Sequence, residues 1–171
     1  MLLGAPLLAI AVLLAWYASS YPGREPVSER DIGPDAIRTG AGQSIGDSAP
    51  SQAVINGRRF NLEVASDVAS RGLGLGGRSA LADDSGMLFV FPAEGFHRFW
   101  MKDVSFPLDL IYIAGDGTIV DIQTMEPEPG VPDAARTLYK PPMEVLLAME
   151  INGGLALRLG IEAGMAVRFD R

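Results

Sequence analysis

The pattern of apolar and polar positions divides the chain into three parts. Residues 1–20 are almost entirely apolar, residues 21–53 are rich in Pro, Gly, Ser and acidic side chains, and residues 54–171 contain short apolar runs separated by turn residues. Short strands spaced about 8–12 residues apart are typical of sandwiches and barrels. We therefore predict an N-terminal apolar helix, a flexible linker and one compact all-β domain with minor α content. That domain is expected to be a β-sandwich or a barrel-like fold with one or two short helical turns.

Two hairpins are the clearest local elements. Asn56-Gly57 separates two β-forming runs within 53–65, and a type I′ turn needs positive φ at both of its central positions. Gly115-Asp116-Gly117 separates two further runs within 108–125. Further strands are predicted at 87–91, where Pro92 ends the run, at 96–102 and at 165–169. Single helical turns are predicted at 66–71 and 155–159. Residues 144–151 fit either a strand or a helix.

The apolar segment 1–20 has two main interpretations. Its length is just sufficient for a membrane span, and Trp16-Tyr17 stands where interfacial aromatic residues are common. Ala18-Ser19-Ser20 equally resembles the small-residue site at which a signal peptide is cleaved. A buried core helix is a third alternative. In both main cases we expect the domain to lie outside the cytoplasm, membrane-anchored or secreted (periplasmic), with the membrane as a partner if the segment is not cleaved.

Composition excludes several kinds of chemistry. The chain has no cysteine, so disulfides and thiolate-based catalytic or metal sites are absent. Its formal net charge of −7 opposes a nucleic-acid partner, because phosphate binding needs clustered cations. The glycine-rich run 72–77 matches G-x-G-x-x-G, but too few residues follow it for the helix that a dinucleotide site requires. We expect no metal and no cofactor, and His97, the only histidine, is expected to be an ordinary strand residue.

Trp100 and Lys102 are the most informative polar and aromatic pair. On the predicted strand 96–102 they lie on one face, because side chains alternate. An aromatic ring beside an ammonium group suits an anionic or sugar-like ligand. The alternative is a half-buried tryptophan whose lysine neighbour extends into solvent. Asp109 is a candidate ion-pair partner for Lys102 or Arg78.

Four sequence words in a fixed order resemble the family called domain of unknown function 192. They are GLGGRSAL at 74–81, GMLFVF at 86–91, FWMKD at 99–103 and PLD at 107–109. The resemblance covers about residues 54–171. It implies a single small β domain, often behind a signal or anchor segment in bacterial members, and no established activity.

The same resemblance ranks the candidate site residues. The tentative ligand-binding residues that match motif positions are Arg78, Trp100, Lys102, Asp109 and Glu150. The chain departs from the family pattern in having Gly76 where Met is usual, Asp103-Val104 where Asn-Thr is usual and Met165 where Asp is usual. A polar site that depends on that Asn or on that late Asp is therefore not expected here.

These features favour an envelope-located, non-catalytic binding or accessory domain, because no catalytic constellation is recognisable. Two alternatives stay open. One is a hydrolase or lyase acting on envelope carbohydrate, which needs two carboxylates converging at roughly 5–10 Å. Its candidates are Asp103, Asp109, Glu144 and Glu150. The other is a structural protein-interaction domain without a small-molecule site.

Overall fold

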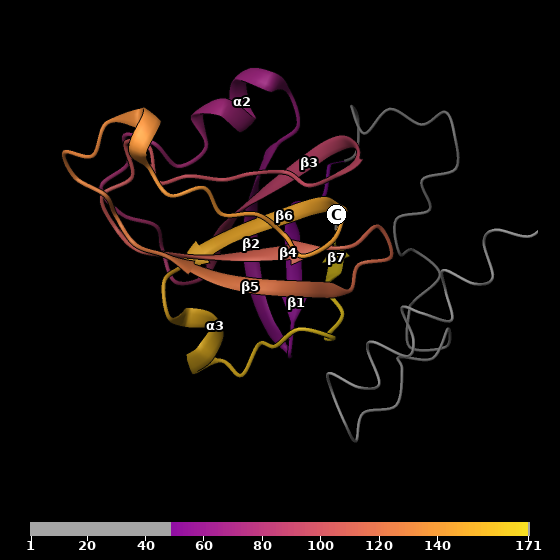
Figure 1. Ribbon diagram of the computed structural model, residues 1–171. Coiled ribbons are helices and arrows are strands. Elements are labelled where there is room, and N and C mark those ends of the chain that lie inside the picture. Colours follow the sequence, from indigo (N-terminus) through magenta and orange to yellow (C-terminus); the bar gives the residue numbers. More distant parts are fainter. Residues whose placement is uncertain (1–48, 171) are drawn as a thin grey trace, which may run out of the picture. The chain divides into compact units, whose positions relative to one another are not determined.

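The computed structural model describes residues 49–170, which form seven strands and three short helical turns (Figure 1). The predictions for the apolar segment and most of the linker fall outside these residues. Neither α-helix in the described part has the length and apolar character needed to cross a bilayer. The elements are β1 (Gln52–Ile55), β2 (Arg58–Ala65), α2 (Val68–Leu73), β3 (Ser85–Gly95), β4 (Leu108–Ile113), β5 (Ile119–Met125), the 3-10 turn η1 (Asp133–Ala135), β6 (Val145–Asn152), α3 (Leu155–Arg158) and β7 (Arg168–Asp170).

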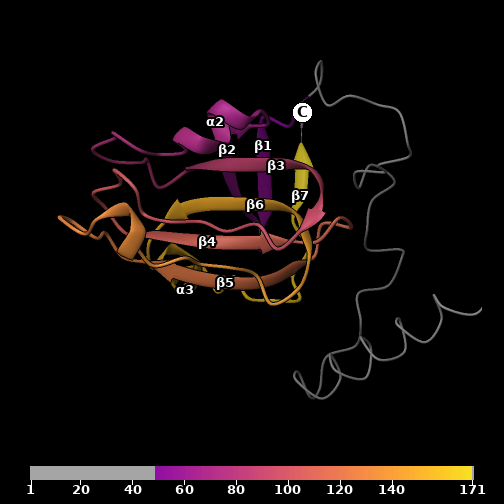
Figure 2. The same ribbon diagram turned by 45° about the horizontal axis from the view of Figure 1, so that its top comes forward.

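All seven strands belong to one curled sheet, with the order β5-β4-β6-β3-β2-β1-β7. Only β2 and β3 pair in parallel, and every other neighbouring pair is antiparallel. Figures 1 and 2 show the sheet bending round from β5 to β7. The prediction of a mostly β domain is confirmed, and of its two forms the barrel-like one is observed. The sandwich is wrong for the described residues, because they form a single sheet and not two packed ones.

The two ends of the sheet meet beside the turn between β4 and β5. The amide of Ile119 donates to the carbonyl of Met165 at 2.8 Å, and the amide of Gly164 donates to the carbonyl of Ile119 at 2.8 Å. The amide of Val167 donates to the carbonyl of Gly117 at 2.9 Å. The segment just before β7 thus bonds to the start of β5, while β7 itself pairs with β1. This contact closes one end of the curl.

The sheet has an apolar cluster on each face. The first cluster receives side chains from all seven strands and from α3, which identifies it as the inside of the curl; its largest members include Phe60, Leu88, Ile111, Ile113, Met149 and Ile151. The second cluster lies on the other face, where Leu75, Phe99 and Met101 from the connecting loops cover β3, β4 and β6. The loops on that second face carry most of the candidate site residues.

Both predicted hairpins are confirmed. Ile55 pairs with Arg58 across a turn in which Asn56 and Gly57 have φ of 49° and 75°, as a type I′ turn requires. Leu108 pairs with Met125 in the second hairpin. The open question about residues 144–151 is settled as a strand, because β6 pairs with both β3 and β4.

Three strand predictions need correction. The last predicted strand, 165–169, is confirmed only from Arg168, where β7 begins. β3 does not end at Pro92 but continues to Gly95, with an irregular register after Val90 that accommodates a residue without an amide hydrogen. Residues 96–102 do not form a strand of the sheet. Their one ladder contact is an isolated bridge in which Phe99 and Tyr139 exchange two backbone hydrogen bonds of 2.9 Å. The segment is extended but crosses over the second face of the sheet and does not join an edge.

Candidate functional site

The extended segment 96–102 keeps the alternation of a strand although it lies outside the sheet. Phe99 and Met101 point into the second cluster and are 8% and 1% exposed. Phe96 and Trp100 point outward and are 55% and 39% exposed. The side chain of Lys102 is 41% exposed on the same outward side. Buried neighbours therefore fix which way the outward residues face.

A second segment, 136–140, runs antiparallel beside the first. Because Phe99 is bridged to Tyr139, Trp100 lies opposite Leu138 and Arg98 lies opposite Lys140. Leu138 is 54% exposed, and Arg98 and Lys140 are also exposed. We call the outward side chains of the two segments the binding strip. Its members are Phe96, Arg98, Trp100, Lys102, Leu138 and Lys140.

Trp100 and Lys102 lie next to each other at the centre of the binding strip. The ammonium nitrogen of Lys102 is 5.5 Å from the centroid of the indole ring, within the range of a cation–π contact. The same ammonium donates to Asp133 at 2.5 Å, and this hydrogen bond raises the pKa of Lys102 and lowers that of Asp133. Lys102 is therefore held as a cation over the ring. Its predicted partner, Asp109, is not the one that it binds.

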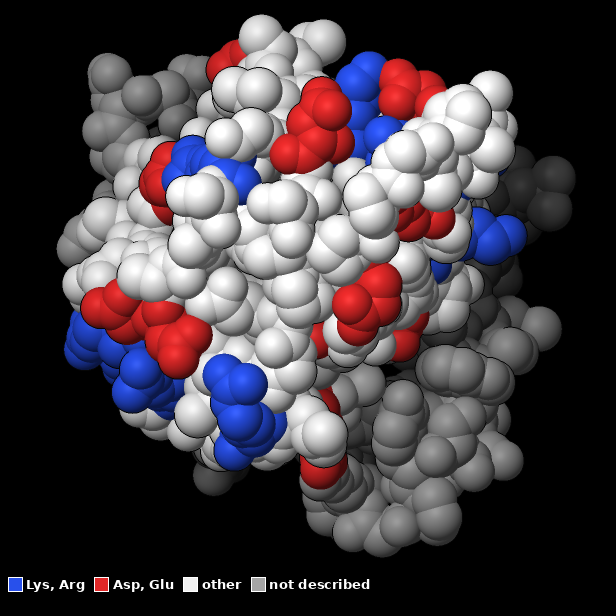
Figure 3. Space-filling view, turned by 90° about the vertical axis from the view of Figure 1, so that its left-hand side faces the viewer, with Lys and Arg blue, Asp and Glu red and all other residues white. Residues whose placement is uncertain are grey.

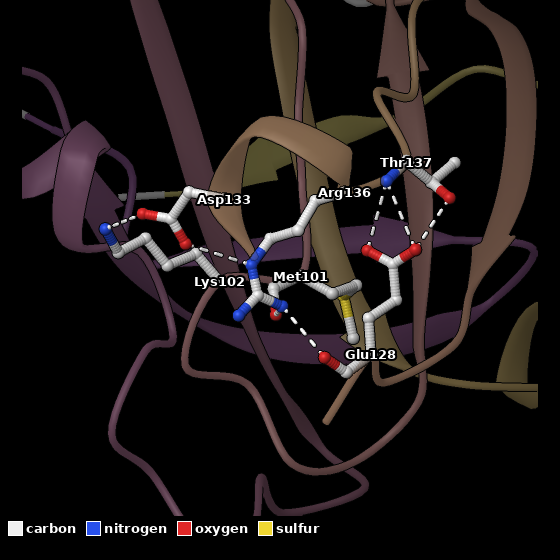
Figure 4. A network of polar contacts seen from close by, with 6 residues as sticks. All are labelled: Met101, Lys102, Glu128, Asp133, Arg136 and Thr137. Atoms are coloured by element: carbon white, nitrogen blue, oxygen red, sulfur yellow. Dashed lines mark hydrogen bonds and ion pairs between the residues drawn. The ribbon is translucent and has the colours of Figure 1, made fainter. Parts of the chain in front are cut away.

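A polar network ties the two segments together (Figure 4). The guanidinium of Arg136 donates to Asp133 at 3.1 Å, to the carbonyl of Met101 at 3.4 Å and to the carbonyl of Glu128 at 3.0 Å. The carboxylate of Glu128 in turn accepts hydrogen bonds from the amide and hydroxyl of Thr137. Since the side chain of Arg136 is only 11% exposed, these bonds are shielded and hold the loops in one arrangement.

Arg78 has a different partner from the one predicted. It forms a two-pronged pair with Glu63 at 2.5 and 2.7 Å, which lowers the pKa of that carboxyl. Its backbone lies near the candidate loop, because Ser105 donates to the Arg78 carbonyl at 3.4 Å and Gly77 donates to the carbonyl of Asp103 at 2.8 Å. The guanidinium is thus engaged on the sheet, while its backbone supports the loop that carries Lys102.

Asp109 lies on the inner face of the sheet and is buried. Its carboxylate accepts from the hydroxyl of Thr124 at 2.7 Å, from the amide of Gly154 at 3.0 Å and from the amide of Ala156 at 2.8 Å. It thereby binds the first amides of α3 and fixes the turn between β6 and that helix. The suggested ion pair with Lys102 or Arg78 is wrong, and the contacts of Asp109 are structural.

Glu150 is buried on the opposite, second face, between Met87 of β3 and Leu110 of β4. Burial raises its pKa to about 8. Tyr112 is a diagonal neighbour, and its buried hydroxyl has no hydrogen-bond partner among the described residues. Burial also raises the pKa of this phenol. Glu150 is therefore not on the binding strip but buried on the second face of the sheet.

The paired-carboxylate arrangement gains no support from these positions. Asp109 pairs with Ile151 while Glu150 pairs with Leu110, so the two buried carboxyl groups project from opposite faces of the sheet. Glu144 lies just before β6 and precedes Glu150 by six residues, which in extended chain corresponds to about 20 Å. A cleft flanked by two of these carboxylates would need a spacing of roughly 5–10 Å.

Two further motifs have structural roles. In the glycine-rich run, the amides of Gly74, Gly76, Gly77 and Arg78 all donate to backbone carbonyls, so this turn leaves none of them for an anion. The ring of His97 stacks on Phe91 with centroids 3.5 Å apart.

On the side of the molecule that carries η1, charged side chains of both signs surround an uncharged central area (Figure 3).

The partners of Lys102 and Trp100 were not found from the sequence. Asp133, Arg136 and Leu138 lie in a Pro-rich loop without a periodic pattern. A signal was nevertheless present, because Asp133 and Arg136 are three residues apart, a spacing at which opposite charges meet in one helical turn. What the sequence lacked was any indication that this turn faces the segment 96–102.

The comparisons with known proteins concern the domain and not the apolar segment. No curated protein matches the chain. A crystal structure from Sinorhizobium meliloti 1021, provisionally described as a transcription regulator (R01717), is 31% identical and covers 69% of this chain and 90% of its own, with a TM-score of 0.60. A protein of unknown function from Novosphingobium aromaticivorans DSM 12444 is 29% identical and covers 75% of this chain and 99% of its own, also with a TM-score of 0.60.

The family model that matches carries the description "Uncharacterized ACR, COG1430" and spans residues 51–169, which include every strand except the last residue of β7. The resemblance read from the four sequence words is thereby confirmed. The chain belongs to the domain of unknown function 192 (DUF192) family.

Proposed function

We propose that this protein is an envelope-located, non-catalytic binding domain whose ligand contacts the binding strip. The observation that carries the proposal is the exposed indole of Trp100 with the ammonium of Lys102 at 5.5 Å from its ring centroid. An aromatic face together with a fixed cation suits an anionic or carbohydrate-like ligand.

The packing and hydrogen bonds beneath the binding strip indicate a preformed surface, which favours a role in binding. Phe99 and Met101 are buried on either side of Trp100. Arg136 links the two segments through its hydrogen bond to the Met101 carbonyl, and Asp133 and the Glu128 carbonyl hold its guanidinium in place. A surface that is ordered before it meets its ligand loses little conformational entropy on binding. The envelope location rests on the apolar segment 1–20, which is expected to direct or anchor the chain.

Two sets of probes test the proposal with the purified full chain. Calorimetric titration with neutral oligosaccharides and with inorganic polyphosphate is expected to identify binding by at least one set. Trp100→Ala is expected to weaken that binding about tenfold, as removal of a central tryptophan commonly does. Leu157→Ala is the control, because Leu157 is also an exposed apolar residue but lies on α3. Binding that Trp100→Ala leaves unchanged, or no binding either of these two sets of probes or of anionic lipid vesicles, would contradict the proposal.

A further inference from the structure

We propose that the binding strip docks onto the surface of an anionic phospholipid bilayer. This inference rests on the proposed function, in that it takes the strip to be a binding surface and names what it binds. It is carried by the combination of side chains on the strip, which includes both exposed apolar groups and cations that have no ion-pair partner among residues 49–170.

The apolar members of the strip fit the interfacial region of a bilayer. Phe96, Trp100 and Leu138 are all exposed and all face outward, and Trp100 lies opposite Leu138. An indole can stack on a sugar, but an exposed leucine beside it gains little from a hydroxyl-rich ligand. Aromatic and aliphatic side chains together are typical of surfaces that insert shallowly between lipid headgroups.

The cations of the strip indicate that this bilayer is anionic. Arg98 and Lys140 lie opposite each other, and neither side chain has a hydrogen bond or ion pair with any described residue. No described carboxylate neutralises either cation, and the phosphate groups of an anionic surface would supply the missing partners. Two cations facing each other are notable in a chain whose formal net charge is −7. The rest of such a chain is repelled by an anionic surface, so docking would be oriented by the strip.

The remaining cation of the strip, Lys102, is held in place by its ion pair with Asp133. Lys102 and the largely buried Arg136 share the carboxylate of Asp133, and exposed Asp103 adjoins Lys102. Among the described residues, the unpaired positive charge of the strip is therefore that of Arg98 and Lys140. The sequence places roughly thirty residues between the predicted apolar segment and β1, and a flexible chain of that length has a root-mean-square span of about 30 Å. If the segment is in the membrane, the strip can reach the same bilayer at a high effective concentration.

Trp100 itself can report the docking. The chain has two tryptophans, and Trp16→Phe leaves Trp100 as the only one in an otherwise complete protein. This variant is reconstituted into vesicles of phosphatidylcholine alone or mixed with phosphatidylglycerol, each containing a lipid brominated near the headgroup. We expect the emission of Trp100 to shift to the blue and to be quenched in the mixed vesicles only.

Paired substitutions distinguish the effect of the cations on the strip from the effect of the protein's net charge. In the Trp16→Phe background, Arg98→Ala with Lys140→Ala is expected to lower the ratio of docked to undocked protein about 30-fold. The control, Arg58→Ala with Arg158→Ala, removes the same charge from exposed positions outside the strip and is expected to leave quenching unchanged.

The outcomes are distinct. Quenching that is equal in neutral vesicles, or that survives loss of Arg98 and Lys140, would overturn the lipid inference. Absence of quenching with binding of oligosaccharide or polyphosphate that depends on Trp100 would overturn it and leave the proposed function intact. Absence of both would overturn the two together. Tighter binding to a single-stranded oligonucleotide than to the mixed vesicles, dependent on Arg98 and Lys140, would replace lipid with nucleic acid and so also overturn the inference.

Discussion

Two buried acidic residues on neighbouring strands show how position decides what a carboxyl group does. Asp109 accepts three hydrogen bonds and satisfies the first amides of α3. Glu150 points to the other face, where apolar side chains surround it and its pKa rises to about 8. The alternation of side chains along a strand does not indicate that only one of these carboxyl groups has hydrogen-bond donors within reach among the described residues. The difference arises because only the inner face brings the start of a helix to the start of β4, where Asp109 lies.

The raised pKa of Glu150 predicts a stability that falls with rising pH. In the unfolded chain this carboxyl titrates near 4.5, whereas in the folded protein it titrates near 8. The folded state therefore binds the extra proton between these values, so stability from this group is full below pH 4.5 and is lost as the pH rises through 8. The loss is on the order of a few kcal/mol. Urea denaturation at pH 5, 6, 7 and 8 measures it.

Substitution isolates this residue from the other titrating groups. Glu150→Gln keeps the shape without the charge and is expected to remove most of the decline between pH 5 and 8. Glu144→Gln, at an exposed position just before β6, is expected to keep the decline. A decline of equal size in the Glu150→Gln protein would show that other groups cause it.

Residue-level reasoning found part of the candidate site, for a local reason. Trp100 and Lys102 are two positions apart, so alternation alone places them on one side. Asp133 is 31 residues from Lys102, and the amide of Ala156 is 47 residues from Asp109. Partners at such separations depend on tertiary packing, and the pairs that were suggested for Lys102 and Asp109 were accordingly wrong.

At the scale of elements, turn chemistry was a better guide than apolar periodicity. Asn56-Gly57 encodes its hairpin because the turn needs positive φ, whatever the rest of the chain does. The alternation in 96–102 was real, but it reflects one face on the second cluster and not membership of a ladder. Apolar periodicity indicates that one side of an extended chain is buried. It does not indicate whether the backbone of that chain is hydrogen-bonded to a neighbouring strand.

The junction between β6 and α3 depends on a close approach that only glycine permits. A Cβ on Gly153 would lie 2.7 Å from the Cβ of Pro107, and the Gly153 amide donates to the Pro107 carbonyl at 2.9 Å. Gly153→Ala is therefore expected to lower the free energy of unfolding by about 1–3 kcal/mol. Gly72→Ala, within α2 and with nothing within 4 Å, is expected to raise it by about 0.5–1 kcal/mol.

Thermal unfolding of the two glycine variants checks this contrast. If Gly153→Ala melted at or above the temperature of the unsubstituted protein, the contact with Pro107 would not be a constraint. The comparison is fair because neither glycine requires the left-handed backbone region, so any difference reports the space around the new methyl group.

For the whole molecule, the sequence indicated a β-sandwich or a barrel-like domain, and it indicated no strand order. The parallel pairing of β2 with β3 joins strands separated by α2 and the glycine-rich turn, and β6 inserts between β3 and β4. Neither arrangement follows from local pattern, because both depend on which strands can cover the two apolar clusters together. The backbone hydrogen bonds between residues 164–167 and 117–119 likewise depend on tertiary packing and not on local pattern.

Closure of the sheet can be tested at the turn between β4 and β5. Gly117 has φ of +88°, and a Cβ there would lie 3.2 Å from the Val167 carbonyl. Gly117→Ala is expected to strain the turn and to speed hydrogen exchange at the amides of Ile119, Gly164 and Val167 about tenfold or more, because their bonds cross the closure. Gly130→Ala is the control, since Gly130 has φ of +76° with nothing within 4 Å.

The control carries a similar backbone strain without touching the closure, so the two variants separate strain from contact. We expect exchange at those three amides to be unchanged in Gly130→Ala, and exchange at the central strands β4 and β6 to stay slow in both proteins. Equal acceleration in the two variants would mean that the end of the curl opens through general loss of stability. In that case the segment before β7 would not be what holds the curled sheet together.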